Sequence, residues 1–197
     1  MTGRTANAVV LASGSPQRRE ILERLGIEFS VVEPDVEELT HGDPEEVVLA
    51  NALLKGRAIA REGCLTIACD TEVALAGHLF GKPGDPLRAH EYLAQLSGLA
   101  HTVLSGLAVF GPEPEDVRTG VERTAVTFRD LSREEIDAYV ASGEWQGRAG
   151  GYAVQGLGST LVGRIDGDLT NVIGLPVGLL ARLAPELALG EAGDDAR

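Results

Sequence analysis

One short stretch, in which an apolar run ends directly at a carboxylate, constrains the fold of this chain most. Residues 65–69 form a mainly apolar run, and Asp70 follows without an intervening residue. A run of this length predicts a strand that is buried on both faces. Because ligands of open α/β sheets lie beyond the carboxyl ends of strands, we expect Asp70 to face a ligand site, with Lys82 as a nearby cation. A solvated strand-end carboxylate and a turn lysine are the alternative, since both are common on loops.

Three Ser-Pro or Asp-Pro pairs predict where helices begin: Ser15-Pro16, Asp43-Pro44 and Asp85-Pro86. A serine or aspartate accepts backbone hydrogen bonds at the N-cap, and proline suits the first helical position. Apolar runs at residues 8–12 and 28–33 precede the first two pairs and predict two strands.

The middle of the chain has a different pattern. Residues 102–110 and 117–128 are β-rich runs on either side of a loop that contains glycine and proline, which predicts a long antiparallel hairpin. Strands that alternate with helices, followed by an antiparallel pair, predict an α/β fold with a mixed β-sheet flanked by helices. We expect one domain over residues 1–190 and an acidic, frayed tail at 191–197.

The last third of the chain contains a glycine-dense segment, residues 143–158, which is too apolar in places to be a linker. We interpret it as a shaped loop that holds Gln155. Before it, Ser132 begins a helix with a capping box. After it, we expect a strand at 157–165 and a last helix at 177–183.

Charge and composition exclude several classes of function. The net charge is −13, whereas proteins that bind nucleic acid or anionic membranes cluster Lys and Arg. Only 4% of the residues are aromatic, which argues against stacking of single-stranded bases. No apolar run approaches the roughly 20 residues of a membrane span. Cys64 and Cys69 are too far apart on one strand to form a disulfide, so we expect free thiols and a cytoplasmic protein.

Cations at the start of the first predicted helix break a local rule. Gln17, Arg18 and Arg19 occupy its first turn, and cations there oppose the helix dipole by about 0.3–1 kcal/mol. The conflict disappears if an anion binds, because free backbone N–H groups, the dipole and the arginines then act together. The alternative is that both arginines are solvated or paired with Glu20 and Glu23.

Lys55 lies beside the apolar stripe predicted for the second helix. A lone lysine in this position is usually a surface residue whose stem covers apolar side chains. The residues assigned to the stripe are Val47, Val48, Ala50, Leu54, Ala58 and Ile59.

Several catalytic patterns are missing from the sequence. It has no dinucleotide fingerprint and no P-loop. Its four histidines show no metal-ligand spacing, and Ser13 and Ser15 lack the nucleophile-elbow pattern. The remaining candidates are the cations Arg18, Arg19, Lys55 and Lys82 and the carboxylates Glu38 and Asp70. Carboxylates without His or Cys favour Mg²⁺ or Mn²⁺, and this combination suits hydrolysis of a phosphoanhydride.

Seven segments together resemble the Maf-like nucleotide pyrophosphatase family, the septum-formation-inhibitor-like proteins. They occur in the family's order and span nearly the whole chain. The segments are LASGSPQRREIL from Leu11, VEE from Val36, CDTEV from Cys69, FGKP from Phe80, LSG from Leu96, YAVQG from Tyr152 and NVIGLP from Asn171.

The resemblance implies a two-lobed α/β fold around a central cleft, often in a homodimer, and metal-dependent cleavage of nucleoside triphosphates to monophosphate and pyrophosphate. It implies that Asp70 is the essential acid. The positions that match the family's phosphate- and metal-handling residues are Ser13, Arg18, Glu38, Lys55 and Lys82. The positions that match its base-discriminating residues are Gln17, Thr71 and Gln155. Gln17 departs from the Arg of the dTTP/UTP branch and from the Trp of the 7-methyl-GTP branch.

Our leading hypothesis is therefore a nucleoside triphosphate pyrophosphatase. Asp70 would be the general base or a metal ligand, and Glu38 would help to hold the metal. The cations would neutralise phosphates, one of which the Ser13–Ser15 turn would hold. The alternative is a regulator of cell division that senses nucleotides without turning them over.

Overall fold

A seven-stranded mixed sheet forms the centre of the protein. The computed structural model describes residues 8–113 and 115–189. The strands are β1 (Ala8–Ala12), β2 (Phe29–Val31), β3 (Cys64–Leu75), β4 (His78–Phe80), β5 (Ala100–Phe110), β6 (Val117–Phe128) and β7 (Val162–Asp166). Their order is β2-β1-β3-β5-β6-β7, and β4 pairs with the far end of β3. Strand β1 is parallel to β2 and β3, and the other pairs are antiparallel, which confirms the mixed sheet.

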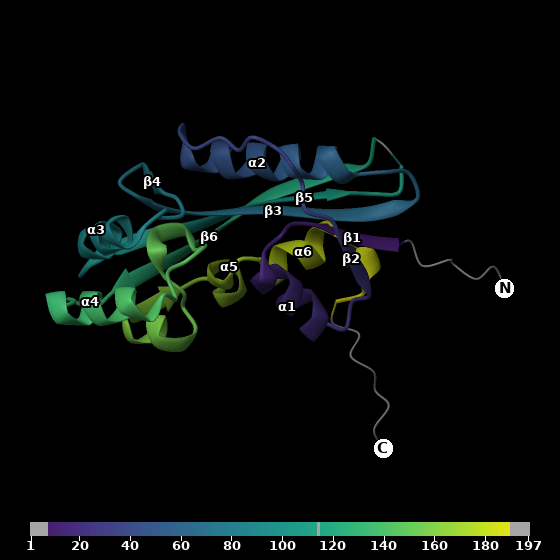
Figure 1. Ribbon diagram of the computed structural model, residues 1–197. Coiled ribbons are helices and arrows are strands. Elements are labelled where there is room, and N and C mark those ends of the chain that lie inside the picture. Colours follow the sequence, from purple (N-terminus) through teal and green to yellow (C-terminus); the bar gives the residue numbers. More distant parts are fainter. Residues whose placement is uncertain (1–7, 114, 190–197) are drawn as a thin grey trace, which may run out of the picture.

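Helices cover both faces of this sheet, as Figure 1 shows. Helix α2 packs along β3 and β5 on one face, and α1, α5 and α6 lie on the other. The helices are α1 (Pro16–Arg24), α2 (Pro44–Ile59), α3 (Pro86–Leu96), α4 (Arg133–Ser142), α5 (Leu169–Ile173) and α6 (Val177–Leu183). Three 3-10 turns are η1 (Ala149–Gly151), η2 (Gly156–Thr160) and η3 (Pro185–Leu187). In the described part of the chain, no helix has the length and apolar character needed to cross a bilayer.

The predicted helix starts are confirmed. Pro16, Pro44 and Pro86 each occupy the first helical position. The Asp43 side chain accepts hydrogen bonds from two backbone N–H groups of the first turn of α2. Ser132 and Glu135 form the expected capping box of α4. These signals are local, so the sequence alone was enough to find them.

The prediction that a strand stops where Asp70 begins was wrong. Strand β3 continues to Leu75, and Asp70 lies in its middle, opposite Gly106 of β5. A charged residue can stay inside a strand when its side chain is neutralised, and Asp70 accepts a hydrogen bond from Lys55. Strand β3 can therefore extend beyond the apolar run, because Lys55 of α2 pairs with the Asp70 carboxylate.

The buried side of α2 also differs from the predicted stripe. Leu54 and Ala58 are exposed, whereas Lys55 is only 6% exposed. Lys55 is therefore not a surface lysine that covers apolar side chains, contrary to the first interpretation. The buried residues of α2 are Val47, Val48, Asn51, Ala52, Lys55 and Gly56.

Smaller corrections concern the end of the chain. Residues 156–160 form a 3-10 turn, so the last strand begins at Val162 and not at residue 157. The short helix α5 was not predicted, because five residues carry little periodic signal. The predicted acidic tail, residues 191–197, lies outside the described residues.

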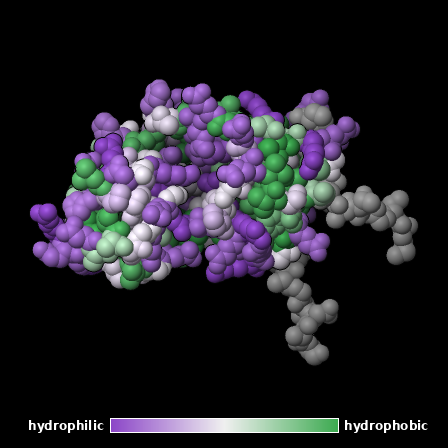
Figure 2. Space-filling model, viewed as in Figure 1, coloured by the Kyte–Doolittle hydropathy of each residue, from purple (hydrophilic) through white to green (hydrophobic). Residues whose placement is uncertain are grey.

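Two large apolar clusters stabilise the two ends of the sheet. One packs α3 and α4 against the sheet and includes Leu93, Phe128 and Tyr139. The other packs α1 and α6 against it and includes Leu22, Ile67 and Leu180. The division into two lobes around a cleft remains a prediction. Figure 2 shows that one face of the molecule is largely hydrophilic and is hollowed near its middle.

Candidate active site

The candidate site lies at an interruption in one edge of β3. Strand β1 pairs with β3 only as far as Ala68, and β4 resumes the pairing at Val73. Among the described strands, residues 69–72 therefore have a partner only on the β5 side. Side chains of a strand alternate between its faces, so Asp70 and Glu72 point towards α2 and Thr71 points towards α1. The interruption allows groups from both faces to meet.

The turn from β1 into α1 supplies Ser13 and Arg18. Ser13 is buried, and its Oγ accepts hydrogen bonds from Arg18 Nη1 at 3.0 Å and from the backbone N–H of Ser15 at 3.2 Å. Ser15 Oγ in turn donates to Gln17 Oε1 at 3.1 Å and does not cap the helix. The turn is thus fixed by the very residues that the sequence singled out. Arg19 is instead exposed and paired with Glu23, which is the alternative considered above for the two arginines.

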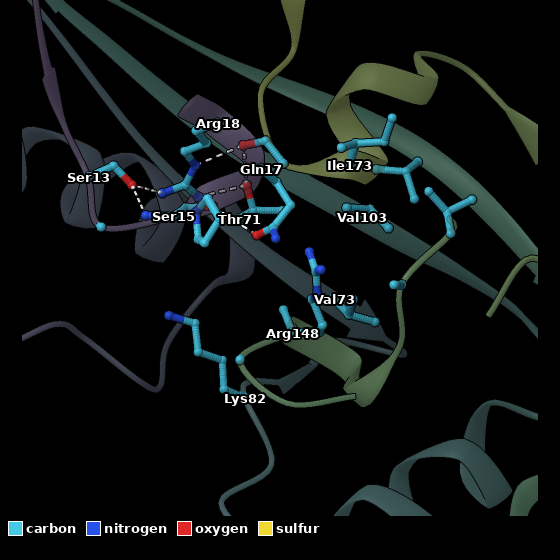
Figure 3. A pocket seen from close by; sticks show the side chains of 18 of the residues that line it. Ser13, Ser15, Gln17, Arg18, Thr71, Val73, Lys82, Val103, Arg148 and Ile173 are labelled. Atoms are coloured by element: carbon cyan, nitrogen blue, oxygen red, sulfur yellow. Dashed lines mark hydrogen bonds between the residues drawn. The ribbon is translucent and has the colours of Figure 1, made fainter. Parts of the chain in front are cut away.

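Arg18 connects this turn to β3 and α5. Its Nε donates to the carbonyl of Gly174 at 2.9 Å, and its Nη2 donates to Thr71 Oγ1 at 3.1 Å. Thr71 Oγ1 also lies 2.8 Å from Ser105 Oγ. The Arg18 side chain is 8% exposed, so a fixed positive charge lies just under the cavity wall. Figure 3 shows the guanidinium between Ser13 and Thr71.

On the α2 face, one ammonium group joins two carboxylates. Lys55 Nζ lies 2.6 Å from Asp70 Oδ1 and 2.7 Å from Glu38 Oε2. Burial raises the pKa of the Asp70 carboxyl, but the charge and hydrogen bond of Lys55 and the charge of Arg18 outweigh it and hold the pKa below its usual value. Asp70 is therefore ionised at neutral pH.

Glu72 is a site residue that the sequence reasoning did not assign. Its Oε2 is buried and has no hydrogen-bond partner among the described residues. Burial raises the pKa of Glu72 to about 7, and the charge of Asp70 adds to this rise. Two carboxyl groups on one face of β3 thus have pKa values displaced in opposite directions. The available signal was the spacing of two residues within CDTEV, which places both carboxyl groups on one face.

Asn51 is the second residue that was missed. It is completely buried, and its Nδ2 donates to Asp70 Oδ2 at 3.0 Å. It precedes Lys55 by four residues, so both side chains lie on the same side of α2. The signal in the sequence was a polar residue at helical spacing from Val47, Val48 and Lys55.

A cavity of about 330 Å³ opens beside these groups. This is within the range of small-ligand sites. Its lining includes Lys55 and Thr71, whereas Asp70 is 4% exposed and lies behind them. Gln17 and Gln155 reach the cavity from opposite segments of the chain. The apolar part of its wall includes Val73, Val103, Val172 and Ile173.

Two cations of the cavity, Lys82 and Arg148, stand apart from the ion pairs of the described residues. Neither Lys82 nor Arg148 forms an ion pair or a side-chain hydrogen bond with another described residue, although both line the cavity. Figure 3 shows Arg148 directed towards Gln17, and Lys82 on the opposite side of the opening from Ile173. The backbone N–H of Gly150 donates to the carbonyl of Gly81, which joins the loops that carry the two cations.

The structure thus brings together the residues selected from the sequence. The cavity is lined by Ser13, Ser15, Gln17, Arg18, Glu38, Lys55, Thr71, Lys82 and Gln155, and Asp70 contacts Lys55 directly behind it. Their roles in catalysis and binding remain predictions. A cavity rich in cations, with the ionised Asp70 carboxylate directly behind its wall, can bind a polyanion and orient a water molecule against it.

Comparison with known families agrees with this arrangement. A family described as Maf-like protein matches residues 8–187, nearly the whole chain. The chain belongs to the Maf family. The α/β fold with a mixed sheet is therefore the fold that the resemblance implied.

Relatives of known name cover most of the chain. The protein from Deinococcus radiodurans is 44% identical over 186 residues, which are 93% of this chain and 94% of that protein. The protein from Dictyoglomus thermophilum is 41% identical over 86% of this chain and 90% of its own length. A third, from Bacillus cereus, is 40% identical over 91% of this chain and 90% of that protein. Each is named a dTTP/UTP pyrophosphatase.

Proposed function

We propose that this Maf-family protein is a nucleoside triphosphate pyrophosphatase that acts on pyrimidine nucleotides such as dTTP and UTP. Water would attack the α-phosphorus, the bond between that phosphorus and the bridging oxygen would break, and pyrophosphate would leave. The observation that carries the proposal is the cavity itself, which Lys82 and Arg148 line and behind which the buried, ionised Asp70 is paired with Lys55. The names of the relatives support the same reaction and the same bases.

The cations of the cavity would bind the triphosphate. Lys82 and Arg148 are free to pair with it, and Arg18 adds a fixed charge beneath the Ser13–Ser15 turn. Positive charge that is already in place stabilises the charge that develops on the leaving pyrophosphate. Gln17, Thr71 and Gln155 would contact the base, as the resemblance implies.

Asp70 would orient and deprotonate the attacking water. Its carboxylate is ionised but lies behind Lys55. A bound phosphate would draw the Lys55 ammonium towards the cavity, and this movement would uncover Asp70 Oδ1. Substrate binding would therefore expose the base only when there is a phosphate to attack.

A divalent cation fits the same carboxylates. Glu38 and Asp70 converge on one position, which the Lys55 ammonium occupies and which a divalent cation would share. Hard carboxylate oxygens suit Mg²⁺ or Mn²⁺. Among the described residues no cluster of three or more Asp, Glu, His or Cys forms a complete metal site, so phosphate and water would supply the other ligands. The metal would supply charge neutralisation at the phosphates.

The alternative function, a regulator that binds nucleotides without cleaving them, is not favoured. The site retains both carboxylates and the cations Arg18, Lys55 and Lys82. Binding alone would give no reason to keep an ionised aspartate next to a phosphate site, because its charge repels the ligand.

Replacement of one carboxylate tests the reaction. We expect Asp70→Asn to reduce pyrophosphate release from dTTP and UTP by at least about 100-fold, because amide nitrogen cannot accept the proton of water. Release is measured with Mg²⁺ or Mn²⁺ on dTTP, UTP, 7-methyl-GTP and modified pyrimidine triphosphates. Asp137→Asn is the matched control, since Asp137 lies on α4 with 56% of its side chain exposed. An Asp70→Asn variant with full activity would remove Asp70 from the mechanism.

A further inference from the structure

The segment that carries Glu38 has no regular structure and few connections to the rest of the protein. We call residues 33–42 the Glu38 segment; it runs from just after β2 to the N-cap of α2. Leu39 and Glu38 provide its hydrogen bonds and ion pairs to other described residues. The partners are Asn51 and Lys55, both on α2. The position of Glu38 in the site therefore depends on these two side chains.

Asn51 and Lys55 each connect the Glu38 segment to Asp70. The Asn51 amide accepts from the Leu39 N–H at 2.8 Å, donates to the Leu39 carbonyl at 3.0 Å and donates to Asp70 Oδ2 at 3.0 Å. Lys55 bridges Glu38 and the other oxygen, Asp70 Oδ1. Both oxygens of the Asp70 carboxylate are thus held from α2, one by an amide and one by an ammonium.

The two connections differ in how they respond to a bound triphosphate. The Lys55 ammonium is charged and lines the cavity, so a phosphate attracts it away from the carboxylates. The Asn51 amide is neutral, 0% exposed and outside the cavity lining, so it is not drawn in the same way. When Lys55 turns to the phosphate, Asn51 is the side chain that still holds both Asp70 and Leu39.

We propose that Asn51 is a positioning residue for this reaction: it keeps the Asp70 carboxylate and the Glu38 segment in their reactive arrangement while Lys55 engages the substrate. The inference rests on the proposed function for its kinetic consequence. Its structural part, the attachment of Leu39 to α2 through one buried amide, does not depend on the reaction.

Two substitutions of Asn51 distinguish its hydrogen bond with Asp70 from its hydrogen bonds with Leu39. Asn51→Leu removes all three hydrogen bonds at similar volume. Asn51→Asp keeps the shape and an acceptor for the Leu39 N–H, but its ionised carboxylate donates neither to Asp70 Oδ2 nor to the Leu39 carbonyl. Val48→Ala is the control, because Val48 is buried on α2 one turn earlier and packs against Ala74 and Leu104. It weakens the packing of α2 without contacting Asp70.

We expect both Asn51 variants to lower kcat for pyrophosphate release by about 10- to 100-fold, the usual effect of losing a group that orients a reacting side chain. KM should stay within about twofold, because Lys82 and Arg148 are unchanged. Hydrogen exchange at the Leu39 amide should accelerate on the order of tenfold in Asn51→Leu and stay near the wild-type rate in Asn51→Asp. Val48→Ala should lower the melting temperature with kcat within about twofold.

Distinct results would overturn the inference. Wild-type kcat in Asn51→Asp would remove the contact with Asp70 from the mechanism. If Asn51→Leu loses no more kcat than Val48→Ala at equal stability, or if Leu39 exchange is unchanged, Asn51 is a structural residue only. A wild-type protein that releases no pyrophosphate from any nucleotide contradicts the proposed function itself, and Leu39 exchange then still tests the attachment of the Glu38 segment.

Discussion

At the scale of single residues, neighbouring side chains of the same type have very different environments. Arg18 and Arg19 are adjacent in the first turn of α1, and the same two interpretations apply to both when only the sequence is considered. In the structure, Arg18 is buried and bonds to two side chains and one backbone carbonyl, whereas Arg19 is exposed and paired with Glu23. The helical period decides this, because a step of one residue rotates the side chain by about 100° around the axis.

This difference predicts unequal effects of the same substitution. Arg18→Lys should lower the free energy of unfolding by about 2 kcal/mol, because an ammonium cannot reach Ser13, Thr71 and the Gly174 carbonyl together and leaves buried acceptors unpaired. Arg19→Lys should change it by less than about 0.5 kcal/mol, as is usual at exposed sites. Urea denaturation of the two variants makes the comparison. Equal effects would mean that the Arg18 bonds contribute no net stability.

At the scale of elements, the loop between α4 and β7 is shaped by glycine. Gly150 lies in η1 with φ +68°, and a Cβ added to it would lie 2.8 Å from Val73 Cγ2. Its N–H donates to the carbonyl of Gly81, the residue before Lys82. A residue without a side chain is therefore needed both for the backbone conformation and for the close approach of this loop to β3.

We expect Gly150→Ala to lower the free energy of unfolding by roughly 3 kcal/mol, since the strained conformation and the contact with Val73 both oppose it. Gly147→Ala is the matched control, because Gly147 has a similar φ of +70° and no atom within 4 Å of the added Cβ. It should lose only about 1–2 kcal/mol. Thermal and urea unfolding measure both variants. The same loss in both would show that η1 moves away from Val73 at little cost.

At the scale of the whole molecule, the dependence of stability on pH reflects a buried histidine. His101 is 3% exposed, and its Nε2 lies 2.8 Å from the hydroxyl of Tyr152. Burial lowers the pKa of His101 to about 4, from 6.5 in an unfolded chain. Between these values His101 binds more protons in the unfolded chain than in the folded protein, so its contribution to the free energy of unfolding decreases as the pH falls from 6.5 to 4, whereas the raised pKa of Glu72 acts in the opposite direction.

The contribution of His101 to this decrease should be about 3 kcal/mol, from about 1.36 kcal/mol for each pKa unit. We expect His101→Gln to be less stable than the wild type at pH 7 and to show a shallower loss of stability between pH 6.5 and 4. Urea denaturation at a series of pH values measures both slopes. Equal slopes in the two proteins would assign the acid sensitivity to other groups.

The sequence by itself determined the local features of this protein. Proline at the first helical position marks the starts of α1, α2 and α3, and Asp43 and Asp85 also cap α2 and α3, because these signals involve only residues of the first turn. The segments that resemble the Maf family indicated the α/β fold with a mixed sheet and many of the residues that line the cavity, since they specify residue types at each position.

Only the tertiary structure decided how the charges pair. Asp70 and Thr71 are neighbours in the sequence, but their side chains lie on opposite faces of β3. Asp70 contacts Lys55 of α2, and Thr71 contacts Arg18 of α1. Whether Lys55 is a surface lysine or the partner of Asp70 depends on how α2 packs across the sheet, and Asn51 becomes part of the site by the same packing. Burial and charge pairing arise from contacts between distant segments, and a pattern within one segment cannot specify them.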